Sequence, residues 1–273
     1  MKLAVCLYGY FNNRADPKSG DKGISYLKQN VLDKIPSHDV DIYLHSWEPQ
    51  REAELTDIYK PKWSKFEKQI DFDALAKSRG VDQSYIDEGF DRSSTMYHQC
   101  KISSSLSFFY SRAASLEFVD PKDYDCVIVC RYDIGHRSRL HKGFNVSQMR
   151  FPLGLDMQYI YSAMWKQHNA GYADQWFLGN PSLVKSLRHM PEAFLEALTS
   201  NHYEQSLRKW PDSSGKNQFS NERLTPTGAS PKSYPRWQMI NNHLFHKYFF
   251  LTYGDGELYC KSKFICHNGK VYG

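Results

Sequence analysis

The chain has 273 residues, of which 41% are hydrophobic, so it is long enough to bury a substantial core in one domain. Its net charge of +5 is modest and no dense run of Lys and Arg occurs, which favours a small anionic ligand and argues against nucleic acid as a partner. The six cysteines form no CxxC pair, and neither a signal peptide nor a transmembrane segment is visible, so we expect reduced thiols and a cytoplasmic protein.

The first half of the chain begins with the pattern of a βαβ unit. Residues 3–8 and 41–47 are short apolar runs typical of strands, and residues 24–35 between them carry apolar side chains at helical spacing. This order predicts two parallel strands in one sheet. Residues 50–95 are charged and contain only weak helical segments, so we expect a surface excursion or a lid.

The second half alternates between helical and strand patterns. We expect helices at residues 97–118, 181–198 and 236–248, and strands or short extended segments at 126–130, 149–153, 158–164, 173–178, 249–253 and 258–266. The helix at 181–198 has Asn180 before it and Pro181 at its first position. Residues 211–234 are rich in Ser, Pro, Asn and Gly, which predicts a mobile loop.

The most informative segment is the strand at residues 126–130, which stops at Arg131-Tyr132-Asp133. Ligands of open α/β sheets collect at the carboxyl ends of strands, where the Asp133 carboxylate could hold a divalent cation and its diphosphate. An Asp that ends a strand and begins a turn is the alternative interpretation. Polar groups also follow other strands, at Tyr8-Gly9, at 45–47 and at 174–176, and together they predict one shared cleft.

The loop after the first strand has features that suit a phosphate. Gly9 would let backbone N–H groups approach it, although neither GxGxxG nor GxxxxGK[ST] occurs. Arg14, Lys18 and Lys22 could meet a diphosphate, and a solvated basic loop is the alternative.

Two further residues are candidates for chemistry. Asp174 lies beside large aromatic residues, which would raise its pKa as a general base requires, unless it is a turn-forming Asp. His267 could be a metal ligand for a Mn-like cation, but it has no partner at ligand spacing and a structural His is the alternative.

Taken together, these segments resemble a family of bacterial and large-virus glycosyltransferases with the GT-A fold. The resemblance follows the motifs LAVCLYGY, DVDIYLHSW, MYHQCKISSSLSFFYSRAASLEF, YDCVIVCRYD and YADQWFLGN, continues weakly through HLFHKYFF, and covers most of the chain. In GT-A enzymes an Asp-x-Asp motif at the end of a central strand binds the nucleotide sugar through a divalent metal. Here that place reads Arg131-Tyr132-Asp133, so the second acidic residue is kept and the first is replaced. Either Asp133 with a cation or Arg131 itself could therefore neutralise the diphosphate.

The resemblance implies an α/β, GT-A-like single domain over residues 1–273 with a Rossmann-like, mostly parallel central sheet flanked by helices. It implies transfer of a hexose or pentose from a nucleotide diphosphate sugar to a glycan or other hydroxyl acceptor, with a donor-binding half at 1–135 and an acceptor-binding half at 136–273. The residues predicted from the strand ends and the resemblance together are Tyr8, Gly9, Arg14, Trp47, Arg131 and Asp133 for the donor, and Asp174 as the base of an inverting mechanism. Asp133 and His267 are the residues predicted to bind Mn or Mg. A non-catalytic nucleotide-sugar-binding module is the main alternative, and a nucleotidyltransferase or sugar-modifying enzyme on a similar sheet is a third.

Overall fold

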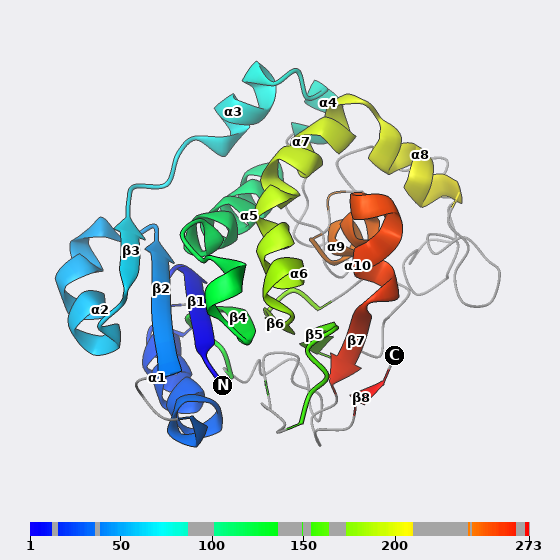
Figure 1. The fold of residues 1–273 in the computed structure, drawn as a ribbon. Coiled ribbons are helices and arrows are strands. Elements are labelled where there is room, and N and C mark those ends of the chain that lie inside the picture. Colours follow the sequence, from blue (N-terminus) through cyan, green and yellow to red (C-terminus); the bar gives the residue numbers. More distant parts are fainter. Residues whose placement is uncertain are drawn as a thin grey trace.

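A computed structural model describes residues 1–12, 16–35, 39–86, 101–135, 149, 154–163, 173–209, 240, 242–265 and 271–272. The described chain folds around one eight-stranded sheet with the order β3-β2-β1-β4-β6-β5-β7-β8 (Figure 1). Helices cover the sheet, so the expected α/β class with a mixed, largely parallel sheet is confirmed.

Parallel strands form one half of the sheet. They are β1 (Leu3–Gly9), β2 (Val40–Ser46), β3 (Trp63–Phe66) and β4 (Cys126–Arg131). The other half is mixed and consists of β5 (Ile160–Ala163), β6 (Trp176–Gly179), β7 (Ser262–Ile265) and β8 (Val271–Tyr272). Here β6 runs antiparallel to both β4 and β5, whereas β7 is parallel to β5.

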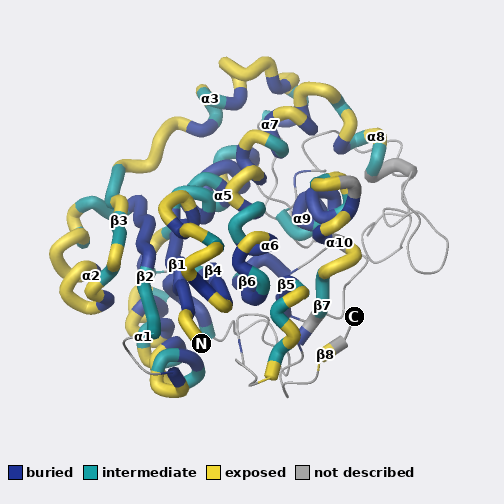
Figure 2. Tube along the Cα trace, viewed as in Figure 1, coloured by how far each residue is buried: buried dark blue, intermediate teal, exposed yellow. Residues whose placement is uncertain are grey.

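The sheet lies between two hydrophobic cores, which explains why its central strands are apolar on both faces (Figure 2). One core packs the alternate residues Leu3, Val5 and Leu7 of β1 against α1 (Ser19–Asn30) and α2 (Glu52–Tyr59). The opposite core packs the other residues of β1 against the remaining helices. These are α3 (Phe72–Ser78), α4 (Gln83–Ile86), α5 (Ile102–Leu116), α6 (Pro181–Ser186), α7 (Met190–Thr199), α8 (His202–Lys209), α9 (Asn242–Thr252) and α10 (Glu257–Cys260).

Several predicted elements differ from the structure. Residues 50–95 contain β3, which pairs with β2 and extends the sheet, in addition to the expected short helices. The strand predicted at 249–253 is wrong, because these residues continue α9 and the turn after it. The helix predicted at 181–198 is divided into α6, a short 3₁₀ turn and α7, with the Asn180 side chain accepting hydrogen bonds at its start. The loop predicted at 211–234 lies outside the described residues.

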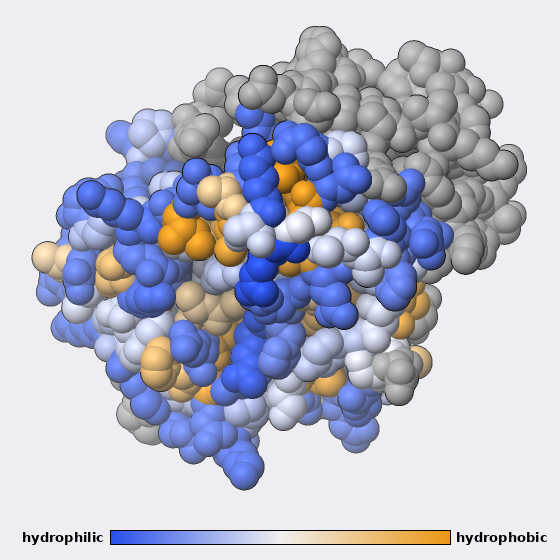
Figure 3. All heavy atoms as spheres, turned by 90° about the horizontal axis from the view of Figure 1, so that it is seen from above, coloured by the Kyte–Doolittle hydropathy of each residue, from blue (hydrophilic) through white to orange (hydrophobic). Residues whose placement is uncertain are grey.

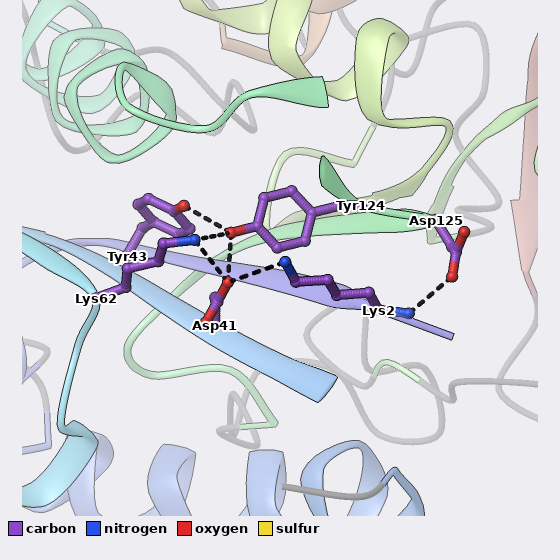
Figure 4. Close-up of polar contacts among 6 residues, drawn as sticks. All are labelled: Lys2, Asp41, Tyr43, Lys62, Tyr124 and Asp125. Atoms are coloured by element: carbon purple, nitrogen blue, oxygen red, sulfur yellow. Dashed lines mark hydrogen bonds and ion pairs between the residues drawn. The ribbon is translucent and has the colours of Figure 1, made fainter. Parts of the chain in front are cut away.

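A polar cluster joins the amino ends of the four parallel strands (Figure 4). The Tyr124 hydroxyl donates to Asp41 Oδ2 at 2.6 Å and lies 2.7 Å from the Tyr43 hydroxyl. Lys62 Nζ donates to both Asp41 and Tyr124, at 2.9 and 3.0 Å. Lys2 Nζ lies 4.0 Å from Asp41 and over the Tyr124 ring. The cluster fixes the strand starts, and the opposite edge of the sheet carries the candidate site.

The face seen from above in Figure 3 carries small, separate hydrophobic patches between hydrophilic side chains. Within the described part of the chain, every helix is too short or too polar to span a bilayer.

Candidate functional site

The parallel half of the sheet contains a topological switch point. The chain leaves β1 through α1 and reaches β2 on one side, whereas it leaves β3 through α5 and returns to β4 on the other side of β1. The connections that follow β1 and β3 therefore run in opposite directions across the sheet. Open α/β sheets bind ligands at the strand ends where the direction reverses in this way, here between β1 and β4.

A cavity of about 570 Å³ lies at this point. The residues that line it are Tyr8, Gly9, Tyr10, Asn12, Trp47, Gln69, Ser104, Ser107, Phe108 and Arg131. They come from the carboxyl ends of all four parallel strands and from the first turns of α5. The volume is in the range of small-molecule sites. Four of the residues predicted for the donor, namely Tyr8, Gly9, Trp47 and Arg131, are thus brought together.

Arg131 and Asp133 form a bidentate ion pair at the end of β4. Arg131 Nε donates to Asp133 Oδ1 at 2.9 Å, and Arg131 Nη2 donates to Asp133 Oδ2 at 2.8 Å. Burial would lower the pKa of Arg131, but the negative charge of Asp133 raises it above its usual value. Both oxygens of the expected metal ligand are therefore already engaged by a cation, so the described residues do not fit a divalent cation held by Asp133.

A chain of hydrogen bonds leads from Glu67 through His45 and Ser111 to the backbone of Gly9. His45 Nε2 lies 3.0 Å from Glu67 Oε1, and His45 Nδ1 lies 2.7 Å from Ser111 Oγ. Ser111 Oγ also accepts the Gly9 N–H at 2.7 Å. Burial would raise the pKa of Glu67, but bonds from His45 and Lys65 lower it. The ionised Glu67 accepts from Nε2–H, so Nδ1 accepts the Ser111 hydroxyl proton. Burial also lowers the pKa of His45, which favours this neutral form.

Gly9 lines the cavity, and its N–H is bonded within the protein. Its φ is +99°, a conformation that favours glycine, and an added Cβ would meet no described atom within 4 Å. The Gly9 N–H is bonded to Ser111 Oγ, so it is not one of the backbone N–H groups that could approach a phosphate there. That other backbone N–H groups of this loop do so stays a prediction.

Asp174 lies behind the cavity and does not line it. Its backbone oxygen accepts a hydrogen bond of 3.2 Å from the Tyr8 hydroxyl, and its side chain lies 3.8 Å from His243 Nδ1. Burial would raise the pKa of Asp174, but the charges of His243, His246, Arg131 and Arg112 together lower it. The expected raised pKa is therefore wrong. The neighbouring Trp176 is only 1% exposed and packs in the α1–α2 core, so it is unavailable for stacking on a sugar.

Arg112 of α5 is a fully buried cation next to this carboxylate. Its guanidinium lies over the rings of Phe108, Phe109 and Phe177 at 5.2 to 5.6 Å. Its Nη1 lies 2.6 Å from His246 Nε2, and since His246 Nδ1 bonds to a backbone carbonyl, Nε2 is the acceptor. Burial lowers the pKa of Arg112, while Tyr8 and Asp174 counteract that effect. Within the described residues, Arg112 Nε and Asp174 Oδ1 have no hydrogen-bond partner.

The remaining predicted residues are placed as follows. Arg14 and His267 lie outside the described residues. Lys18 and Lys22 lie at the start of α1 and do not line the cavity, and Lys22 pairs with Asp16.

Sequence reasoning missed the contribution of α5. Ser104, Ser107 and Ser111 follow one another at spacings of three and four residues, which places them on one side of the helix. A polar stripe on an otherwise buried helix is the signal that could have located them. Gln69 and Tyr10, whose side chains bond to each other at the cavity, gave no such signal.

Comparison of the chain with protein-family models, curated proteins and solved structures finds no match. The arrangement itself offers one guanidinium, several hydroxyl and amide groups, and aromatic surfaces of Tyr10, Trp47 and Phe108. These groups suit a ligand that combines anionic, polar and ring-shaped parts.

Proposed function

We propose that the chain is a GT-A-type glycosyltransferase that uses a nucleotide diphosphate sugar. The cavity that collects the carboxyl ends of β1, β2, β3 and β4 at the switch point carries this proposal. The resemblance of the strand-end motifs to GT-A enzymes gives the reaction class, and the guanidinium of Arg131 gives the cavity a group that pairs with phosphate in bidentate fashion.

In this reaction the bond between the anomeric carbon and the β-phosphate oxygen breaks, and the acceptor oxygen bonds to the same carbon. The nucleoside diphosphate leaves with the bonding electrons, and the acceptor hydroxyl loses its proton to a base. Arg131 faces the developing negative charge of the leaving group, where a fixed cation is most effective. Asp174 is the base that the resemblance implies, and the surrounding cations keep it ionised. Because it does not line the described part of the cavity, this role requires the acceptor hydroxyl to reach it from outside that lining.

A nucleotide-sugar-binding module without activity is the second candidate. Among the described residues that line the cavity there is no carboxylate, since both Asp133 and Asp174 lie behind it. That observation favours binding without turnover.

Incubation with UDP-, GDP- and dTDP-sugars and a panel of hydroxyl acceptors tests the proposal, with release of free nucleoside diphosphate as the readout and heat-unfolded chain as the control. Acceptor-dependent release from one donor class is the expected result. Donor binding without release would select the binding module, and the absence of both would contradict the proposal.

A further inference from the structure

The two members of the Arg131–Asp133 pair are exposed to very different degrees. The Arg131 side chain is 31% exposed and lines the cavity, whereas the Asp133 side chain is 5% exposed and does not line it. A ligand in the cavity would therefore contact Arg131, whereas the Asp133 carboxylate is shielded from it.

Both carboxylate oxygens of Asp133 are bonded to Arg131. Nε and Nη2 of Arg131 each donate to a different oxygen of Asp133, which is the fork-to-fork arrangement of strong Arg–carboxylate pairs. This arrangement holds the guanidinium plane in one orientation, and it leaves Nη1 outside the two bonds. The role of Asp133 in this arrangement is to position Arg131.

The surroundings of Arg131 reinforce its positive charge. Of the described cavity-lining residues, Arg131 is the one with a charged side chain. Ser104 lies in the first turn of α5, whose amino end carries partial positive charge, and no acidic residue occurs in that turn. A divalent cation entering here would meet a guanidinium and would have to displace it from Asp133 to gain a carboxylate ligand.

We infer that Arg131, oriented by Asp133, is the resident cation of the nucleotide diphosphate site and takes the place of a divalent metal. This inference rests on the proposed function. It makes binding of the diphosphate independent of divalent metal, and it assigns Asp133 a positioning role behind Arg131.

Calorimetric titration of the wild-type chain with UDP, GDP and dTDP, in EDTA and again in Mn²⁺ or Mg²⁺, tests this inference directly. The expected result is that the nucleotide that binds does so with the same Kd, within about twofold, in both buffers. Binding that requires the metal would overturn the inference and leave the proposed function standing. No binding of any nucleotide in either buffer would overturn the proposed function as well.

A double variant distinguishes the effect of the Arg131 charge on binding from an effect on folding. Replacing Arg131→Gln together with Asp133→Asn removes both charges and leaves no buried carboxylate unpaired. We expect this double variant to bind nucleotide roughly 10- to 100-fold more weakly in both buffers, the usual effect of losing a hydrogen bond to a charged group. Its matched control is Arg79→Gln with Glu192→Gln, which neutralises an exposed Arg–carboxylate pair between the end of α3 and α7 whose residues do not line the cavity.

The control should bind as the wild type does. If the double variant of Arg131 and Asp133 bound nucleotide in EDTA as tightly as the wild type does, the inference would be overturned. It would also be overturned if the double variant bound weakly in EDTA and added Mn²⁺ restored its affinity.

Discussion

Removal of the Ser111 hydroxyl should measurably destabilise the protein. Ser111→Ala deletes the oxygen that accepts the Gly9 N–H and donates to His45 Nδ1, both at 2.7 Å. His45 is completely buried, so its nitrogen would lose its partner without water to replace it. That unsatisfied acceptor costs about 1 to 3 kcal/mol. Gly9 borders the cavity, where water can reach its N–H, so this second loss adds at most about 1 kcal/mol.

The sum of about 1 to 4 kcal/mol corresponds to a Tm lower by roughly 2 to 16 °C, at about 2 to 4 °C per kcal/mol for a chain of this size. Thermal unfolding followed by circular dichroism measures it. Ser115→Ala is the matched control, since Ser115 is also buried in α5 but its hydroxyl donates only to the Arg112 backbone oxygen within the same helix. A hydroxyl bonded to its own helix contributes little, so this control should be near neutral. Equal Tm values for the two variants would refute the reasoning.

Three other predictions follow from the charges and packing around the site. Burial lowers the pKa of His45 and that of His246, so their contribution to stability is full above the unfolded-state pKa of about 6.5 and is lost as the pH falls toward the folded-state values. The Tm should therefore decline between pH 8 and pH 5, and a constant Tm would contradict this. Asp174→Asn should keep nucleotide affinity in calorimetry but reduce transfer by roughly 100- to 10,000-fold, whereas near-wild-type transfer would place the base elsewhere. Gly23→Ala would put a Cβ 1.8 Å from the Tyr132 backbone oxygen. The overpacking between α1 and the loop after β4 should lower the free energy of unfolding, measured in urea, by about 1 to 3 kcal/mol; an unchanged midpoint would contradict this.

The central strands could be predicted from the sequence because their environment leaves a strong pattern. β1 and β4 are covered on both faces, and this requires short runs of apolar and β-branched residues with no polar interruption. β3 could not be predicted in this way, since its sequence WSKF is short and only partly buried at the sheet edge. Residues 249–253 were predicted as a strand because aromatic residues favour strands in general. In the structure these aromatic side chains pack in the core from the end of α9 and the turn after it.

The position of the cavity could be predicted from the strand ends alone. Parallel strands bring Gly9, Trp47 and Arg131 to one edge of the sheet, whatever the details of packing. The electrostatics could not be predicted, because the charges that lower the pKa of Asp174 come from distant segments, Arg112 on α5 and His243 on α9. Sequence neighbours of Asp174 suggested an apolar environment, and the fold supplies a cationic one.

The claim that a nucleoside diphosphate binds between the ends of the parallel strands is tested most directly by ligand-induced stabilisation of two variants. Ser104→Trp would fill the cavity from an exposed position on α5, whereas Ser103→Trp places the same side chain next to it at a residue that does not line the cavity. At a ligand concentration about 100 times Kd, binding adds about 2.7 kcal/mol to the stability of the folded state. We predict that UDP, GDP or dTDP raises the Tm of the wild type and of the Ser103→Trp variant by several degrees and leaves that of the Ser104→Trp variant unchanged. Equal stabilisation of all three proteins, or of none, would contradict the account.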